Sequence, residues 1–150
     1  MLKIIDYQPH LKATFKELGE EWIKKYMTLI DHDRNILDDP EGEILHKGGE
    51  IIFAEWNGKI VGTAALSKKS ADRFELSKLG VTENAKGLGI GRKLTEEIIS
   101  RAKKRGLKEL YLESNQVLEV AIQLYKKLGF VDLNEKKRTP QCDIQMVLKL

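Results

Sequence analysis

The sequence predicts an α+β (mixed α/β) domain: a central mixed, mostly antiparallel sheet of roughly six to seven strands, flanked by about four helices. Two observations carry this prediction. Asn57-Gly58 separates two apolar runs, and both residues tolerate the positive φ of a type I′ turn, which indicates a β-hairpin. Farther on, strand, helix and strand patterns at 73–81, 89–106 and 107–114 predict a crossover with local parallel pairing.

The first third of the chain predicts one strand and two helices. Residues 2–7 are apolar and β-branched, as in a strand, and from 9 to 30 apolar residues recur every three or four positions, as in an amphipathic helix. The polar stretch 31–49 predicts a loop up to Pro40 and a short helix after it. The apolar positions of the long helix are Leu11, Phe15, Leu18, Trp22, Tyr26 and Leu29.

The middle of the chain predicts the hairpin 50–68, the strand 73–81 and the helix 89–106. In the strand, the parity of apolar positions changes between Leu76 and Leu79. Either a β-bulge or burial of the strand on both faces would explain that change. The helix ends at Gly106, and its buried stripe is expected at Ile90, Leu94, Ile98 and Ala102.

The last third predicts a strand at 107–114, a helix at 116–129, and strands at 130–134 and 143–150. Gly129 is a natural stop for that helix. Its buried stripe is expected at Val117, Val120, Ala121, Leu124 and Leu128, with Tyr125 beside the stripe. The predicted order is β-α-α-β-β-β-α-β-α-β-β, and residues 1–150 are expected to form a single domain.

Composition narrows the class of protein. The chain has 150 residues, 41% hydrophobic and 33% charged, which is typical of a globular domain. The 26 basic residues are nearly balanced by 23 acidic ones, so the signal for nucleic-acid binding is weak, although Lys and Arg cluster at 101–108 and 134–138. No apolar run approaches the ~20 residues of a membrane span. Without a secretory pattern, and with Cys142 as the one cysteine, we expect a cytoplasmic protein.

The stretch "ENAKGLGIGRKL" at 83–94 holds three alternate glycines between a strand and a helix start. Such a turn is a natural anion site, because the first amides of the helix are unpaired and its dipole is positive there. The spacing does not match G-x-x-x-x-G-K-[ST]. It does not match G-x-G-x-x-G either, since Arg92 or Leu94 stands where the third glycine is needed. The turn therefore predicts a phosphate ligand of another class.

"KGLGIG", with Lys86, Gly89 and Gly91, resembles the acyl-CoA pyrophosphate loop of the GNAT superfamily of N-acetyltransferases. The flanking segment 75–94 is similar to the fourth strand, loop and third helix of that family. "LYLESN" at 110–115 resembles its fifth strand, and "AIQLYKKLGF" at 121–130 its A-x-x-L-Y-x-K-x-G-F signature. The motif resemblance covers about residues 50–134. The element order agrees with a GNAT-like fold over the whole chain.

The chain departs from the usual family pattern at three places. Lys86 stands where Arg or Gln is commoner, and Thr82-Glu83 stands where Val-x-Pro is usual. Leu118 occupies the position of a frequent asparagine, while Asn115 sits at the strand end. This last variant resembles the acetyltransferase domains related to MarR-fused regulators. It leaves open which side chain contacts the pantetheine arm.

The resemblance implies acetyl transfer from the co-substrate acetyl-CoA to an amine by direct attack in a ternary complex. Cys142 is then not needed as a nucleophile. The backbone of Leu79 and Val81 is expected to pair with the pantetheine arm, and the Val81 amide to polarise the thioester carbonyl. The resemblance implies a cofactor site formed by Leu79, Gly80, Val81, Lys86, Gly87, Leu88, Gly89, Ile90, Gly91, Arg92, Asn115, Ala121 and Tyr125.

Two side chains are candidates for the chemistry. Tyr125 is the candidate general acid, since a phenol with a pKa of about 10 can donate to a departing thiolate. Glu75 is the candidate base, although a glutamate needs a water relay, burial or a purely orienting role to serve an amine. The alternatives stay open: Tyr125 as a core-edge aromatic and Glu75 as an ordinary strand residue.

The implied acceptor is a small-molecule or peptide amine, bound near Trp22, Tyr26 and Glu75. The acidic run Asp31, Asp33, Asp38 and Asp39 would suit a cationic amine, but Trp22 and Tyr26 could equally belong to the core. No metal, nucleic acid or membrane partner is expected, and a homodimer is left open. A catalytically weak acyl-CoA-binding sensor is the alternative function. A basic nucleic-acid-binding domain is a third, for which no stacking motif is present.

Overall fold

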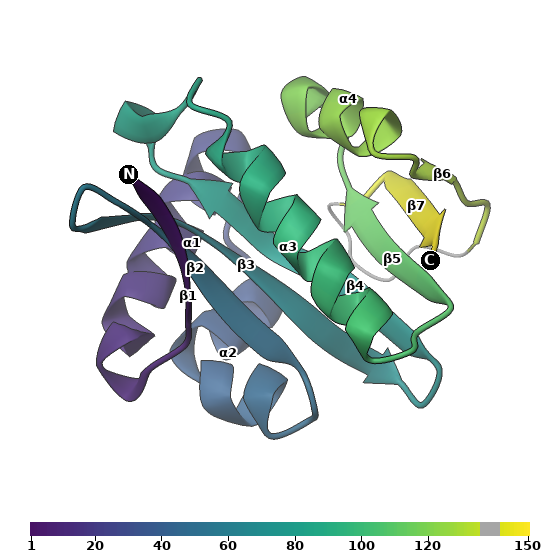
Figure 1. Cartoon of the computed structure of the whole chain (residues 1–150), viewed down its shortest axis with the longest axis horizontal. Coiled ribbons are helices and arrows are strands. Elements are labelled where there is room, and N and C mark those ends of the chain that lie inside the picture. Colours follow the sequence, from purple (N-terminus) through teal and green to yellow (C-terminus); the bar gives the residue numbers. More distant parts are fainter. Residues whose placement is uncertain (136–141) are drawn as a thin grey trace.

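The computed structural model describes residues 1–135 and 142–150, which form one seven-stranded mixed sheet (Figure 1). The strand order is β1-β2-β3-β4-β5-β7-β6, and every neighbouring pair is antiparallel except β4 and β5. This confirms the predicted fold class and the parallel crossover. The strands are β1 Leu2–Asp6, β2 Glu50–Trp56, β3 Lys59–Ser70, β4 Arg73–Val81, β5 Glu109–Ser114, β6 Val131–Asp132 and β7 Ile144–Lys149.

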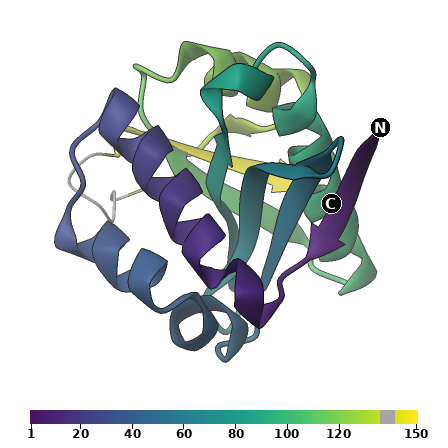
Figure 2. The same ribbon diagram turned by 90° about the vertical axis from the view of Figure 1, so that its left-hand side faces the viewer.

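Helices cover both faces of the sheet. Figures 1 and 2 show α1 and α2 on one face and α3 and α4 on the other. In the described part of the chain the α-helices are α1 Lys12–Tyr26, α2 Asp31–Asp38, α3 Ile90–Lys104 and α4 Glu119–Lys127. The short helical segments there are η1 Pro9–Leu11, η2 Glu41–Leu45 and η3 Glu83–Ala85. The basic cluster predicted at 134–138 lies largely outside the described residues.

The sheet separates two hydrophobic cores. The α1-side core contains Phe15, Leu18, Ile23, Leu37, Ile51 and Phe53, and the α3-side core contains Ile52, Ala54, Leu94, Ile98, Leu110 and Met146. Neighbouring residues of β2 enter opposite cores, because side chains alternate along a strand. The α3 stripe is confirmed, since Ile90, Leu94, Ile98 and Ala102 are all buried.

The turn prediction is also borne out, and the structure decides between the two explanations that the sequence left open for the parity change. Asn57 and Gly58 have φ values of 51° and 84°, as a type I′ turn requires. Lys78 has a φ of 52°, and the register between β3 and β4 shifts opposite it. The parity change between Leu76 and Leu79 is therefore caused by a β-bulge, which turns the end of β4 relative to its start.

The loop prediction for 31–39 is wrong, because residues Asp31–Asp38 form α2. The Ile30 amide donates to Asp33 Oδ2 at 3.3 Å, and acids in the first turn favour the helix dipole. Ile36 and Leu37 are buried against α1, so two apolar residues anchor an otherwise polar helix. The short helix predicted after Pro40 is present as η2, a helix of five residues.

The stripe predicted for the last helix is wrong at its first two positions, whereas Ala121 and Leu128 pack against the α3-side core as expected. Val117 and Val120 are 58% and 86% exposed, whereas Leu118, Ile122 and Tyr125 are buried. The helix begins at Glu119 rather than 116, because Asn115 Oδ1 accepts a hydrogen bond from the Val117 amide at 3.0 Å and holds a turn there. Tyr125 consequently lies within the buried face and not beside it.

Candidate functional site

The glycine turn presents open backbone at the N-terminus of α3. Gly87 and Gly89 have φ values of 84° and 76°, and a Cβ added at either would meet no atom within 4 Å. Gly89 is the N-cap residue and supplies no side-chain cap, so no side chain of this cap satisfies the amides of the first turn. Unpaired amides and a positive dipole end fit a phosphate group at this position.

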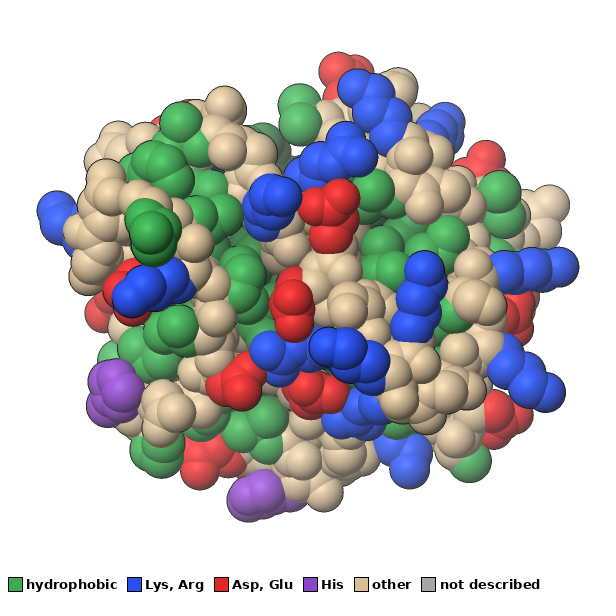
Figure 3. Space-filling model, viewed as in Figure 1, with side chains coloured by type: hydrophobic (Ala, Val, Ile, Leu, Met, Phe, Trp, Pro, Cys, Tyr) green, Lys and Arg blue, Asp and Glu red, His purple; other side chains and the backbone are tan. Residues whose placement is uncertain are grey.

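Basic side chains flank the turn. Lys86 Nζ bonds the Tyr26 hydroxyl and lies 4.6 Å from the centre of its ring. Lys86 also lies 3.5 Å from Glu83, and Arg92 Nε is 3.4 Å from Glu96. Figure 3 shows the surface hollowed between the turn and α4, beside a group of Lys and Arg side chains. These bases can add positive charge to an anion site without lying inside it.

The sheet opens between β4 and β5. Among the described residues these strands pair only at Glu75 and Tyr111, so the C-terminal half of β4 has no partner on that edge. The Thr82 amide donates to the Val61 carbonyl of β3 at 2.8 Å. Because neighbouring residues of a strand turn their N–H groups to opposite edges, the Val81 amide faces the open side.

A cavity of about 350 Å³ occupies this opening. Trp22, Ile23 and Ile36 line it from the α1-side core, whereas Leu79 and Tyr125 line it from the α3-side core. One cavity is thus reached by side chains from both faces of the sheet. Two molecules that approach from opposite faces could meet there, between the separating strands.

Tyr125 reaches the cavity from α4. It is 7% exposed, and its ring packs at 5.7 Å from that of Phe130. Burial raises the pKa of Tyr125 well above its ordinary value, because the phenolate would be poorly solvated. The hydroxyl therefore stays protonated at neutral pH and can serve as a hydrogen-bond donor.

Glu75 reaches the same cavity from β4. It is 6% exposed, and its Oε2 lies 3.8 Å from Lys69 Nζ. The structure thus brings Glu75, Tyr125 and Trp22 together around one space. Gly80 leaves room for Trp22 to pack against β4, since a Cβ at position 80 would lie 3.3 Å from Trp22 Cβ.

Other predicted site residues lie elsewhere. Tyr26 packs beside Trp22 at 5.9 Å but contacts Lys86 near the glycine turn, and it does not line the cavity. Asn115 holds the turn before α4, and Ala121 packs against the α3-side core. Of the four acids in the acidic run, Asp33 lines the cavity, whereas Asp31, Asp38 and Asp39 do not.

The sequence did not single out several charged residues of the cavity, namely Lys69, Lys78, His32 and Glu113. Lys78 Nζ lies 3.0 Å from Asp33 Oδ1, with side chains only 12% and 15% exposed. Burial lowers the pKa of Lys78. The parity change that marked the bulge could have pointed to Lys78, but no sequence signal pointed to Lys69.

Cys142 also lines the cavity and is 8% exposed. Its Sγ contacts the Ile144 carbonyl at 3.0 Å, and burial followed by the nearby Glu113 raises the pKa of the thiol to about 11. Across residues 1–135 and 142–150, no group of three His, Cys, Asp or Glu side chains could hold a metal ion. The same residues contain no helix long and apolar enough to cross a membrane.

Comparison with known protein families gives a match to the Acetyltransferase (GNAT) family over residues 10–130. An uncharacterised N-acetyltransferase of Escherichia coli K12, YjgM, is 30% identical over 109 residues, which are 69% of this chain and 65% of that protein. The 5-NmdU N-acetyltransferase of Pseudomonas phage PaMx11 is 36% identical over 94 residues, or 62% of this chain and 65% of that protein. The matched segment covers only part of the curated relatives: 65% of each of these two proteins and 45% of a probable N-acetyltransferase of Xenopus tropicalis.

Solved structures share the fold over nearly the whole chain. A GNAT-family acetyltransferase from Staphylococcus aureus Mu50 superposes with a TM-score of 0.89 at 22% identity, over 99% of both chains. An N-acetyltransferase from Thermoplasma acidophilum in complex with coenzyme A gives 0.78 at 18% identity, over 100% and 99% of the two chains. YncA from Salmonella typhimurium, solved with acetyl-CoA, gives 0.79 at 21% identity, over 99% and 94%.

Proposed function

This chain belongs to the GNAT acetyltransferase family, and from that premise we propose that it transfers an acetyl group from acetyl-CoA to an amine by direct attack in a ternary complex. One observation carries the proposal: the cavity at the β4–β5 opening is lined from both faces of the sheet. A thioester held on one face and an amine held on the other can approach there without a covalent enzyme intermediate.

The glycine turn supports the acetyl-CoA half of the proposal. Its open backbone at Gly87 and Gly89 leaves room for a pyrophosphate, and the first amides of α3 would donate to it. Lys86 and Arg92 would add positive charge. The relatives of this fold that were solved with coenzyme A or acetyl-CoA support the same ligand. Bound there, acetyl-CoA supplies the activated acyl group.

The backbone of β4 would orient that acyl group. Leu79 and Val81 lie on the unpaired edge of the strand, where an extended pantetheine arm can pair as an added strand. The Val81 amide would then donate to the thioester carbonyl and stabilise the negative charge that develops on its oxygen.

Tyr125 would stabilise the departing thiolate. The pKa of a phenol is ordinarily above that of a thiol, and burial raises the pKa of Tyr125 further, so complete proton transfer from Tyr125 would be uphill. The side chain would act chiefly as a hydrogen-bond donor to the sulfur. The proton released by the attacking amine balances the charge of the leaving group.

Glu75 would receive or orient the amine. Glu75 is buried on β4 and lines the cavity, so its carboxylate lies close to the space where the acceptor would bind. A Glu75→Gln variant keeps the shape of the side chain and removes its basicity. A changed pH–rate profile in that variant supports a role in proton removal, whereas a raised KM with an unchanged profile indicates orientation alone.

The test of the proposed function couples two measurements on the whole chain. Equilibrium binding of coenzyme A reports the cofactor site, and thiol release from acetyl-CoA with a panel of amines reports turnover. Binding together with amine-dependent thiol release supports the enzyme. Binding of coenzyme A without turnover of any amine supports the alternative function, an acyl-CoA-binding sensor. Absence of coenzyme A binding contradicts both the enzyme and the sensor.

A further inference from the structure

We propose that the acceptor is a free α-amino acid with an apolar side chain, held between Lys69 and Glu75. The inference rests on the proposed function and names the substrate class of the same cavity. It follows from two features of that cavity: an apolar wall on its α1-side and a wide ion pair between Lys69 and Glu75.

The wall of the cavity on this side is largely apolar. It is formed by α1, the segment that follows it and α2, through Trp22, Ile23, Met27, Ile30 and Ile36. These side chains can cover an aliphatic or thioether group and release water from it. A strongly polar acceptor such as an aminoglycoside would bury its hydroxyl groups against this wall without partners.

Two ion pairs cross the polar side of the cavity, and they differ. Lys78 and Asp33 are 3.0 Å apart and similarly buried, so their charges largely cancel. Lys69 and Glu75 are 3.8 Å apart, and the Lys69 side chain is 24% exposed while that of Glu75 is 8% exposed. The wider pair therefore places a cation nearer the solvent and an anion deeper in the cavity.

This order of charges fits a zwitterion. The ammonium group of an α-amino acid would bind Glu75, deep in the cavity that Tyr125 also lines. Its carboxylate would bind Lys69, nearer the mouth. Before the reaction the ammonium loses one proton, to Glu75 or through it to solvent, which leaves a neutral amine. The amide N–C bond then forms as the thioester C–S bond breaks, and a second proton lost by the nitrogen neutralises the departing thiolate.

The other charges of the cavity do not replace Lys69 in this role. Lys78 is paired with Asp33, and Glu113 adds a further acid to the lining. Among the described residues the lining thus holds two lysines and three acids, so a carboxylate would be bound by Lys69 itself and not by a general excess of positive charge.

The test compares acceptors that differ by one group. Thiol release from acetyl-CoA is measured with leucine, with leucinamide, which lacks the carboxylate, and with spermidine. We expect kcat/KM for leucine to exceed that for leucinamide by about tenfold, the effect of one charge-assisted contact, and spermidine to be poorer still.

A matched pair of variants assigns the effect to Lys69. Lys69→Met should lower kcat/KM for leucine about tenfold more than for leucinamide, because only leucine carries the carboxylate that Lys69 would bind. Lys68→Met is the control, because Lys68 is the exposed neighbouring lysine and does not line the cavity. Coenzyme A binding should be the same in both variants, which separates a folding defect from a change in acceptor recognition.

The outcomes separate this inference from the proposed function. Turnover with leucinamide or spermidine that equals or exceeds turnover with leucine overturns the amino-acid acceptor but leaves the acetyltransferase. An unchanged leucine preference in Lys69→Met also overturns it. Binding of coenzyme A without turnover of any amine contradicts both proposals.

Discussion

Gly89 and Gly106 stand at the two ends of α3 with the same φ of 76°, and a Cβ on either would meet no atom within 4 Å. At the C-terminal end the backbone closes on itself. The Gly106 amide donates to the Lys103 carbonyl at 2.9 Å, and the Leu107 amide donates to the Ala102 carbonyl at 3.2 Å. At the N-terminal end the N-cap residue is Gly89, which has no side chain to accept hydrogen bonds from the first amides of the helix. A glycine with the same φ therefore ends the helix with backbone hydrogen bonds at one end, and at the other end leaves the first amides without a side-chain cap.

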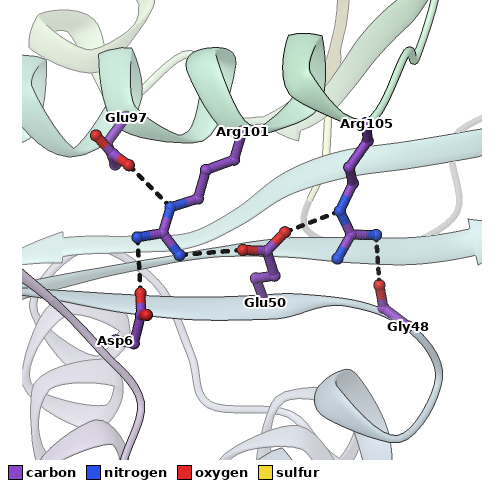
Figure 4. A network of polar contacts seen from close by, with 6 residues as sticks. All are labelled: Asp6, Gly48, Glu50, Glu97, Arg101 and Arg105. Carbon is purple, nitrogen blue, oxygen red and sulfur yellow. Dashed lines mark hydrogen bonds and ion pairs between the residues drawn. The ribbon is translucent and has the colours of Figure 1, made fainter.

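Side chains sharpen this difference. The C-terminal half of α3 is tied to β1 and β2 by a network of ion pairs that Figure 4 shows. Arg101 contacts Asp6 at 2.7 Å, Glu50 at 3.0 Å and Glu97 at 2.9 Å, and Arg105 contacts Glu50 at 2.8 Å and the Gly48 carbonyl at 2.6 Å. We infer that this clamp fixes the helix, so that its other end can present unpaired amides to a ligand.

The largest expected effect comes from closing the open end. Gly89→Asp places a carboxylate where the pyrophosphate is expected, and we predict coenzyme A binding at least about 100-fold weaker. Gly89→Asn has similar size and no charge, so it should retain much more affinity. Calorimetric titration with coenzyme A measures both.

Gly106→Asp is the matched control at the closed end, since it imposes the same unfavourable φ on a residue remote from the ligand. It should lower stability slightly and leave coenzyme A affinity unchanged. Wild-type affinity in a folded Gly89→Asp variant would show that the open end of α3 does not bind the cofactor.

The next effect concerns the cavity rather than the helix. Tyr125→Phe removes the hydroxyl and keeps the buried ring, so kcat should fall about 100-fold with coenzyme A affinity unchanged. Single-turnover kinetics with saturating acetyl-CoA measure the chemical step directly. An unchanged kcat would make Tyr125 a packing residue only.

At the closed end the effect should appear in stability instead. Arg101→Met breaks three ion pairs in a partly buried network, and the free energy of unfolding should fall by about 1–3 kcal/mol. Lys104→Met, an exposed change on the same turn, should cost less than about 0.5 kcal/mol. Urea denaturation measures both, while coenzyme A affinity should stay the same. A large loss of affinity in Arg101→Met would contradict the division of α3 into a binding end and an anchoring end.

The last expected effect, which appears only at alkaline pH, is a pH dependence of stability at the cavity wall. The pKa of Cys142 is raised from 9.0 to about 11, so its folded pKa exceeds its unfolded one. Its contribution to stability is full below pH 9 and is lost as the pH rises through about 11. We expect the free energy of unfolding to fall over that range, and Cys142→Ala to reduce the slope. An identical slope in the variant would show that other groups cause it.

Most of the fold was predictable because its signals are local. Asn57-Gly58 fixes a turn through its own φ values, and the stripe of α3 repeats every four residues. The two failures have different causes. Tertiary contacts of Ile36 and Leu37 hold a polar segment as α2. A local Asx turn at Asn115, which the hydrophobic periodicity did not reveal, shifts the start of α4, so that Val120 faces solvent.

By itself, the sequence determined the glycine turn, the region of the bulge and the residue types of the proposed phosphate site, since each depends on backbone preferences of neighbouring residues. Only the tertiary structure decided which side chains share the cavity. Lys69, Glu75 and Tyr125 come from β3, β4 and α4, and they meet because β4 and β5 pair at one position and then separate. The strand register and the packing of α4 bring these side chains together, and both depend on contacts between residues far apart in the chain.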